Sequence, residues 1–295
     1  MMGVLLGLAA ATLYGVSDFA GGIAAKRAAL LTVVLSSELA ALVVLLAVLP
    51  WLAASGPTGE GLYWGAGAGV AGTAGIALLY RGLAAGRMAI VAPVSAVVGA
   101  LVPVAAGLFS GERPSLVALV GVAVALVAVA LVASAAGDDA PAAGDDAPAG
   151  GSRPSMAALS RSGLFDGLGA GVGFGLLFVL YAAPGPDAGP WPVVGSKAAS
   201  LLFIGTLAAA RRSPIVPPRA SLGLVVTAGG LGVTANVLYL VAARNGLLSL
   251  VAVVTALYPA ATVALARFVL HERLGRAQLV GIVLALGAVA LIATG

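Results

Sequence analysis

The chain contains no cysteine and only one histidine, His271. Without cysteine there is no disulfide, no thiolate metal site and no cysteine nucleophile. A single histidine leaves little for a histidine-based metal centre or a histidine-dependent catalytic triad. The sequence also has no nucleophile elbow and no phosphate-binding P-loop. We therefore expect no enzyme activity, no metal, no cofactor and no ATP-driven pump within this chain.

Charged residues are also scarce. Only 9% of the 295 residues are charged and 61% are hydrophobic, and the mean hydropathy is +1.12. A soluble domain has about 25% charged residues, so this chain has too few to cover a surface in water. Its apolar residues come in blocks of about twenty, the length that crosses ~30 Å of hydrocarbon as a helix. The blocks lack the alternation of barrel strands, so we expect an all-α, multi-pass protein of the cell membrane.

The apolar blocks are separated by charged or Pro/Gly-rich breaks. Many glycines fall inside the blocks, where small residues let neighbouring helices approach closely in lipid. The pattern predicts ten transmembrane helices, near residues 3–23, 30–52, 61–81, 88–109, 115–135, 163–183, 190–210, 220–243, 247–270 and 275–294.

An acidic Pro/Gly/Ala-rich segment, residues 136–162, separates the first five predicted helices from the last five. It contains GDDAPA twice and four aspartates. The spacing of a calcium-binding EF-hand loop and its terminal glutamate are missing. We expect a disordered linker that can be replaced without loss of the fold, because it holds little apolar surface to offset the entropy of ordering.

The two halves, residues 1–135 and 163–295, match each other. Residues 111–133 and 271–293 agree at 12 of 23 positions when offset by 160, and the same offset pairs Gly15 with Gly175. The chain is therefore a duplicated five-helix unit. Because five is odd, the second unit enters the membrane upside down, which predicts two inverted repeats. Such repeats are typical of secondary transporters, with the binding site at the midplane.

Two matched stretches carry a family resemblance: SLVAVVTALYPAATVALARFVLHERLGRAQLVGIVLALGAVALIA (249–293) and IVAPVSAVVGALVPVAAGLFSGERPSLVALVGVAVALVA. Both are similar to the Pro-containing helix, short turn and final helix of EamA-type ten-helix members of the drug/metabolite transporter superfamily. The resemblance covers essentially the whole chain and implies transport, with export expected, of small metabolites or drugs. Two positions depart from it. Tyr14-Gly15 replaces the usual tryptophan-glycine, and Glu38 stands where many members have arginine or a neutral residue.

Glu38 is a carboxylate near mid-depth of the second predicted helix. An isolated charge there costs at least several kcal/mol, so it must be protonated, paired or facing water. The repeat offers a partner, because Lys197 maps onto Ser37 by the 160 offset and occupies nearly the same depth. Two readings stay open. The pair is a structural ion pair between helices, or it belongs to a substrate or proton site.

Further candidates lie on polar stripes. Asp18 and Tyr14 share one face of the first predicted helix with Gly7, Ala11 and Gly21, and such a face packs against protein or lines a cavity. Asn236 and Tyr239 form a like stripe on the eighth. The alternatives are an exposed position at a mouth for Asp18 and interhelical hydrogen bonding for Asn236. Tyr80 and Tyr258 are either site residues or members of an interfacial aromatic belt.

The turn His271-Glu272-Arg273 is matched by Gly111-Glu112-Arg113, which has no histidine. We therefore expect a helix-capping role for these turns instead of chemistry.

The basic residues give conflicting signals on orientation. Alternate loops, beginning with the one between the first and second helices, hold 11 Lys/Arg and the other loops hold two. This placement indicates topology control rather than a patch for nucleic acid, and alone it puts both termini outside. The resemblance implies termini inside, so the orientation stays open.

Together these patterns predict a secondary transporter that works by alternating access between two inverted halves. Glu38 and Lys197 are the expected central charged groups, and Asp18 is a second candidate for proton coupling. Expected partners are a small-molecule substrate, such as a zwitterionic amino acid, and membrane lipid, without nucleic acid and with a monomer as the working unit. The alternative is a non-transporting membrane scaffold or lipid-binding protein whose charged residues form a packed polar core.

Overall fold

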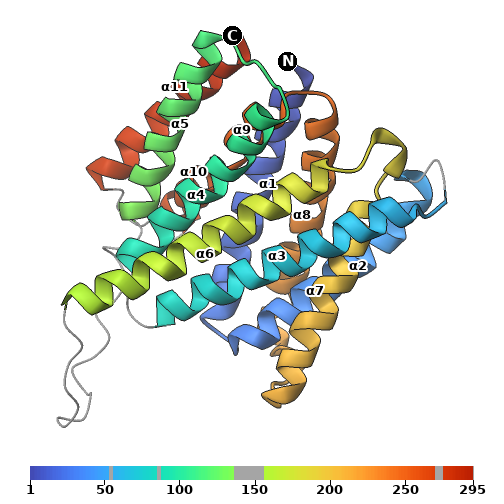
Figure 1. Cartoon of the computed structure of the whole chain (residues 1–295). Helices are drawn as coiled ribbons and strands as arrows, with labels where there is room; N and C mark the ends of the chain where they lie inside the picture. The colour runs from blue at the N-terminus through green and yellow to red at the C-terminus, as the bar shows by residue number, and fades with distance from the viewer. Residues whose placement is uncertain (53–55, 85–87, 136–155, 270–274, 295) are drawn as a thin grey trace.

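A computed structural model of the chain describes residues 1–52, 56–84, 88–135, 156–269 and 275–294 (Figure 1). Every regular element within these ranges is a helix. The elements are α1 (Met2–Ala25), α2 (Leu30–Leu52), α3 (Gly59–Ala84), α4 (Met88–Phe109), α5 (Leu116–Ala135), α6 (Met156–Ala182), the 3-10 turn η1 (Pro186–Ala188), α7 (Trp191–Ala210), α8 (Arg219–Arg244), α9 (Leu248–Thr255), α10 (Tyr258–Val269) and α11 (Arg276–Thr294).

All ten predicted segments are helical, with two differences. The ninth is divided into α9 and α10, because Pro259 has no N–H to donate to the carbonyl of Thr255, the last residue of α9. In the first half the matching residue is Gly99, and α4 continues through it. The second difference is that α6 begins at Met156 and not near residue 163, so it takes up the end of the predicted linker. The rest of that linker, residues 136–155, lies outside the described residues.

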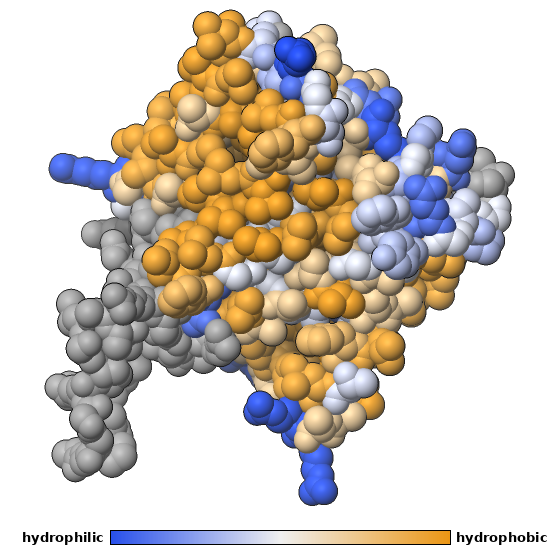
Figure 2. All heavy atoms as spheres, viewed as in Figure 1, coloured by the Kyte–Doolittle hydropathy of each residue, from blue (hydrophilic) through white to orange (hydrophobic). Residues whose placement is uncertain are grey.

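The surface of the helices suits lipid. Among the described residues, eight helical stretches are long and apolar enough to cross a membrane, with α9 and α10 counted as one, and two shorter apolar helices lie within α4 and α5. Large apolar side chains point outward, and Val43, Leu202 and Val283 are 67–71% exposed. Figure 2 shows such residues covering most of one face. In water this surface would drive aggregation, whereas hydrocarbon solvates it.

The packing of the two halves repeats with the 160-residue offset. Gly7 on α1 packs against Val251 on α9, and Gly167 on α6 packs against Val91 on α4. Adding 160 to the first member of one contact and subtracting 160 from the second gives the other contact. Contacts that are reproduced when the two halves are exchanged in this way are those of two halves related by a two-fold axis.

The direction of that axis follows from α5 and α11, which are equivalent helices in the two halves. Gly121 near the start of α5 packs against Ile292 near the end of α11, and Gly281 near the start of α11 packs against Val132 near the end of α5. The two helices therefore run antiparallel. A two-fold axis that reverses a membrane-spanning helix lies in the membrane plane, so the predicted pair of inverted repeats is confirmed. Both termini lie at the same end of the molecule (Figure 1).

Glu112, in the turn between α4 and α5, joins the two repeats. Its carboxylate accepts hydrogen bonds from the backbone N–H groups of Leu248 and Ser249, the latter at 3.0 Å, at the start of α9. These N–H groups have no partner within α9 because they belong to its first turn. The predicted capping role is thus confirmed for Glu112, although the capped helix belongs to the other half. His271, Glu272 and Arg273 in the equivalent turn lie outside the described residues.

Close approach of α8 to α2 depends on Gly229. A Cβ at this position would overlap the carbonyl oxygen of Ser37 and lie 2.9 Å from the amide nitrogen of Ala41. We expect Gly229→Ala to lower the free energy of unfolding by about 1–3 kcal/mol, the usual cost of overpacking. Gly223, on the same helix with no atom within 4 Å of its would-be Cβ, is the matched control.

The measurement is thermal unfolding of both variants in the same detergent. Gly223→Ala is expected to be neutral or to stabilise by up to about 1 kcal/mol, because alanine favours a helix. Equal melting temperatures for the two variants would show that α2 and α8 can separate at no cost.

Candidate functional site

Glu38 and Lys197 form an ion pair at the centre of the molecule. The Nζ atom of Lys197 lies 2.9 Å from Oε2 and 3.2 Å from Oε1 of Glu38, so the ammonium group donates to both carboxylate oxygens. The Lys197 side chain is 9% exposed and that of Glu38 is 18% exposed. Each charge neutralises the other, while the carboxylate keeps some access to its surroundings.

The pair lies where α2 crosses α7, and these two helices are equivalent in the two repeats. Lys197 corresponds to Ser37, the neighbour of Glu38, so each partner contacts nearly its own equivalent position. Such a contact occurs only close to the two-fold axis. The ion pair is therefore near the axis in the membrane plane, which is the midplane position where inverted-repeat transporters bind substrate.

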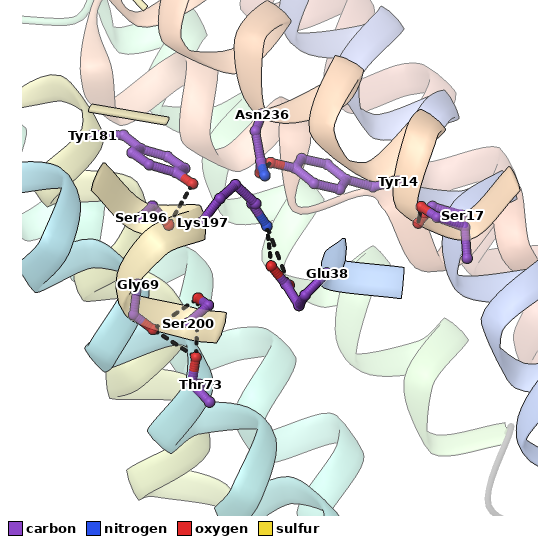
Figure 3. A network of polar contacts seen from close by, with 11 residues as sticks. Tyr14, Ser17, Glu38, Gly69, Thr73, Tyr181, Ser196, Lys197, Ser200 and Asn236 are labelled. Atoms are coloured by element: carbon purple, nitrogen blue, oxygen red, sulfur yellow. Dashed lines mark hydrogen bonds and ion pairs between the residues drawn. The ribbon is translucent and has the colours of Figure 1, made fainter. Parts of the chain in front are cut away.

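A group of aromatic side chains lies near the pair, and Figure 3 shows two of them, Tyr14 and Tyr181. The Tyr14 hydroxyl on α1 donates a hydrogen bond to Oδ1 of Asn236 on α8. The Tyr14 ring meets Phe178 and Tyr258 edge-on, with centroids 6.2 and 6.3 Å apart. Phe178 in turn packs against Tyr239 at 4.5 Å, and the Tyr239 hydroxyl donates to the Phe178 carbonyl at 3.2 Å. The predicted Tyr14, Asn236, Tyr239 and Tyr258 are thus brought together.

Tyr181, on α6, links the aromatic group to the ion pair. Its hydroxyl donates to Oγ of Ser196 at 2.9 Å, and Ser196 precedes Lys197 on α7. Tyr181 interacts electrostatically with both Glu38 and Lys197, and also with Tyr14. Figure 3 shows the Lys197 side chain reaching between Tyr181 on one side and Tyr14 with Asn236 on the other. Six helices, α1, α2, α6, α7, α8 and α10, therefore contribute polar side chains to one central cluster.

The sequence was compared with known families and structures. A family model described as "EamA-like transporter family" matches residues 1–134 and 161–294, and the numbering of these two ranges differs by the same offset of 160. The chain belongs to the EamA-like transporter family. Curated proteins gave no match. A solved structure titled "Crystal structure of protein" shares the fold, with a TM-score of 0.66 and 19% sequence identity. The match covers 98% of this chain and 95% of the solved chain.

Asp18 occupies a more open place in this EamA-like transporter than the ion pair does. It lies one helical turn beyond Tyr14 on α1, interacts electrostatically with the Tyr14 hydroxyl and is exposed. The side chain of Tyr80, the remaining predicted site residue, lies outside the described part of the chain.

Three members of the cluster were missed by sequence reasoning: Phe178, Tyr181 and Ser196. Phe178 could have been found from the repeat, because it occupies the position equivalent to Asp18. Tyr181 is equivalent to Gly21 and Ser196 to Ser36, and neither equivalence indicates a polar site. Their part in the cluster depends on how α6 and α7 both pack on α3, which the duplication alone does not specify.

Proposed function

We propose that this EamA-like protein is a secondary-active exporter of small zwitterionic metabolites, such as amino acids, or of drugs. Its family consists of small-molecule transporters. Export is proposed because it is the direction expected from the resemblance of the sequence to EamA-type transporters. It works by alternating access between the two inverted halves, as a monomer in the inner or plasma membrane. One observation carries the proposal: the Glu38–Lys197 ion pair lies at the crossing of the two repeats beside a cluster of tyrosines.

The chemistry of the cluster supports a zwitterionic substrate. A substrate carboxylate would take the place of Glu38 on Lys197, and a substrate ammonium group would take the place of Lys197 on Glu38. Both charges then stay paired while the site opens to one side or the other. Tyr14, Phe178 and Tyr258 would contact the apolar part of the substrate, and their ring faces also attract a cation.

Asp18 is proposed as a coupling residue. It is exposed beside Tyr14, and a carboxylate on a membrane-spanning helix faces water or protein instead of lipid. A proton on Asp18 would therefore exchange with water on the side to which the site is open. Proton antiport requires a group that gains and loses a proton as the site changes sides, and here that group would be distinct from the substrate contacts. Asp18→Asn should therefore leave substrate binding in place and remove the dependence of flux on a pH gradient.

The test has two stages. A thermal-shift screen of the purified protein with amino acids, other metabolites and lipophilic cations should identify a stabilising ligand. That ligand is then assayed for flux in proteoliposomes with and without a pH gradient, and for efflux from cells. If no compound stabilises the protein and no flux is measured, the scaffold alternative is favoured.

A tyrosine variant makes the test specific to the cluster. Tyr14→Phe removes only the hydroxyl that donates to Asn236, and we expect a roughly three- to tenfold loss of flux, the effect of one hydrogen bond. Tyr63→Phe is the control, because Tyr63 is 73% exposed at the start of α3. An equal loss in both variants would argue against a site at Tyr14.

A further inference from the structure

We propose that the loop joining α7 to α8 binds the headgroup of an anionic phospholipid. Residues 211–219 read RRSPIVPPR, with three arginines and no acidic residue, and all three arginines are exposed. The loop directly follows one membrane-spanning helix and precedes another, so it lies at the level of the headgroups. Figure 2 shows hydrophilic residues at the lower end of the molecule, where α7 ends in Figure 1.

Apolar residues lie between these arginines. Ile215 is 61% exposed and Val216 is 70% exposed, while the Ile215 carbonyl accepts a hydrogen bond from Ser36 Oγ on α2 at 2.8 Å. The same hydroxyl lies 2.6 Å from the Thr32 carbonyl, so its proton is shared between the two acceptors. The loop is thus held against α2 with its apolar tip outward. Apolar residues flanked by basic ones are the pattern of a segment that lies in the membrane interface.

Arg212 has a backbone conformation that favours glycine. Its φ is +51°, and among the described residues no other non-glycine residue has a positive φ. The Arg212 N–H donates to the Ala209 carbonyl at 3.1 Å and the Ser213 N–H donates to the Ala208 carbonyl at 2.9 Å, the hydrogen bonds of a Schellman motif. An arginine at the position where glycine is preferred indicates that its side chain has a use.

The equivalent loop of the other repeat provides an internal comparison. Residues 51–59, WLAASGPTG, match residues 211–219 by the 160 offset and contain no lysine or arginine. Because the repeats are inverted, the described ends of this stretch, residues 51–52 and 56–59, are on the opposite face of the membrane. The three arginines are therefore a property of one face and not of the duplicated unit.

Arginine is well suited to a lipid phosphate. Its planar guanidinium donates two parallel hydrogen bonds to phosphate oxygens. Arg211 and Arg212 directly follow the end of α7, and Arg219 is the first residue of α8. Ile215 and Val216 would enter the boundary between headgroups and acyl chains. A basic residue near an anionic surface raises membrane affinity about five-fold, so removing two arginines should weaken lipid binding about 25-fold.

The experiment titrates the purified full-length protein in neutral detergent with phosphatidylglycerol or phosphatidylcholine. Thermal unfolding gives the stabilisation, and native mass spectrometry counts bound lipids. We expect phosphatidylglycerol to bind and stabilise, and the double variant Arg211→Gln/Arg219→Gln to need about 25-fold more of it. Arg212→Gly should melt at a higher temperature than the native protein without lipid, yet gain less from phosphatidylglycerol. Lys26→Gln/Arg27→Gln, which changes two exposed basic residues in the loop between α1 and α2, should alter the phosphatidylglycerol requirement far less, because these residues lie outside the 211–219 loop.

Several outcomes would overturn the proposal. Equal stabilisation by both lipids would remove the role of charge, and an equal loss in the Lys26/Arg27 control would indicate a diffuse attraction without a site. Equal stabilisation by inorganic phosphate would assign the loop to a soluble anion. The four aspartates of residues 136–155 can also be replaced with asparagine. If this raises the affinity for phosphatidylglycerol, the acidic segment and not lipid is what binds the arginines of the 211–219 loop. None of these readings depends on transport.

Discussion

Glu38→Gln is expected to reduce transport by roughly 30-fold or more while the protein stays folded. Glutamine keeps the shape of glutamate and removes only the charge. A substrate ammonium group then loses a charge-assisted partner, and truncating one side of such a contact costs about 2–5 kcal/mol. Folding should survive because the amide oxygen of glutamine can still accept a hydrogen bond from Lys197, so the buried lysine keeps one partner. Flux in proteoliposomes and thermal unfolding in detergent measure the two effects separately.

The double variant Glu38→Gln/Lys197→Met separates a binding role from a structural one. If the pair only joins α2 to α7, Glu38→Gln leaves Lys197 unpaired and lowers stability by about 3–5 kcal/mol. Adding Lys197→Met would then restore the melting temperature, since it removes the stranded charge. If the pair binds substrate, the double variant stays inactive whatever its stability. Unchanged flux in Glu38→Gln, together with a large loss of stability rescued by the second substitution, would contradict the transport role.

Glu112→Ala is expected to destabilise the protein by about 3–6 kcal/mol. The substitution removes two hydrogen bonds from backbone N–H groups to a charged acceptor, at Leu248 and Ser249, and bonds to a charged group are each worth about 1.5–3 kcal/mol. The first turn of α9 also loses a negative charge that favours its N-terminus. Thermal or chemical unfolding in detergent gives the magnitude.

Glu60→Ala is the control for this loss. Glu60 is exposed in the first turn of α3, so its removal takes away a charge near a helix N-terminus and should cost at most about 1 kcal/mol. Glu112→Gln should fall between native and Glu112→Ala, because the amide oxygen can still accept but carries no charge. Equal stability of the two alanine variants would show that the contact between the repeats contributes nothing.

Much of the fold could be predicted because a membrane imposes a length and a hydropathy on each helix. The duplication of a five-helix unit then predicted that the second half is inverted relative to the first. The alignment of Lys197 with Ser37 predicted that the two central charges lie at one depth. The division of the ninth helix at Pro259 was not predicted, because Pro93 and Pro103 lie within the continuous helix α4 and a proline alone does not fix where a helix ends. What the pattern does not contain is the rotation of each helix about its axis. In lipid both the buried and the outward faces are apolar, so an apolar sequence carries little information on which face meets which neighbour.

The missed members of the site show this limit. Tyr181 and Ser196 meet because α6 and α7 pack closely with α3, where glycines allow backbone contact: Gly69 approaches the Ser196 backbone and Gly75 that of Ala170. Such contacts depend on the fit between two surfaces, and no single helix specifies them. The same limit applies to Asn236. It was predicted to lie on a polar stripe, but its role as acceptor for the Tyr14 hydroxyl depends on the approach of α8 to α1.

The two-fold axis beside the ion pair has a consequence for how a substrate can sit. Every contact across such an axis has a second copy, and the copy of Glu38–Lys197 is Ser37–Ala198, which carries no charge. A perfectly symmetric cavity would hold a molecule equally well in two opposite poses. In the proposed site, one pose would meet a cation and an anion and the reversed pose would meet a hydroxyl and a methyl group. Under the proposed mechanism the duplicated fold would let the protein open to either side of the membrane, while the two charges, which are not duplicated, would bind the substrate in a single orientation.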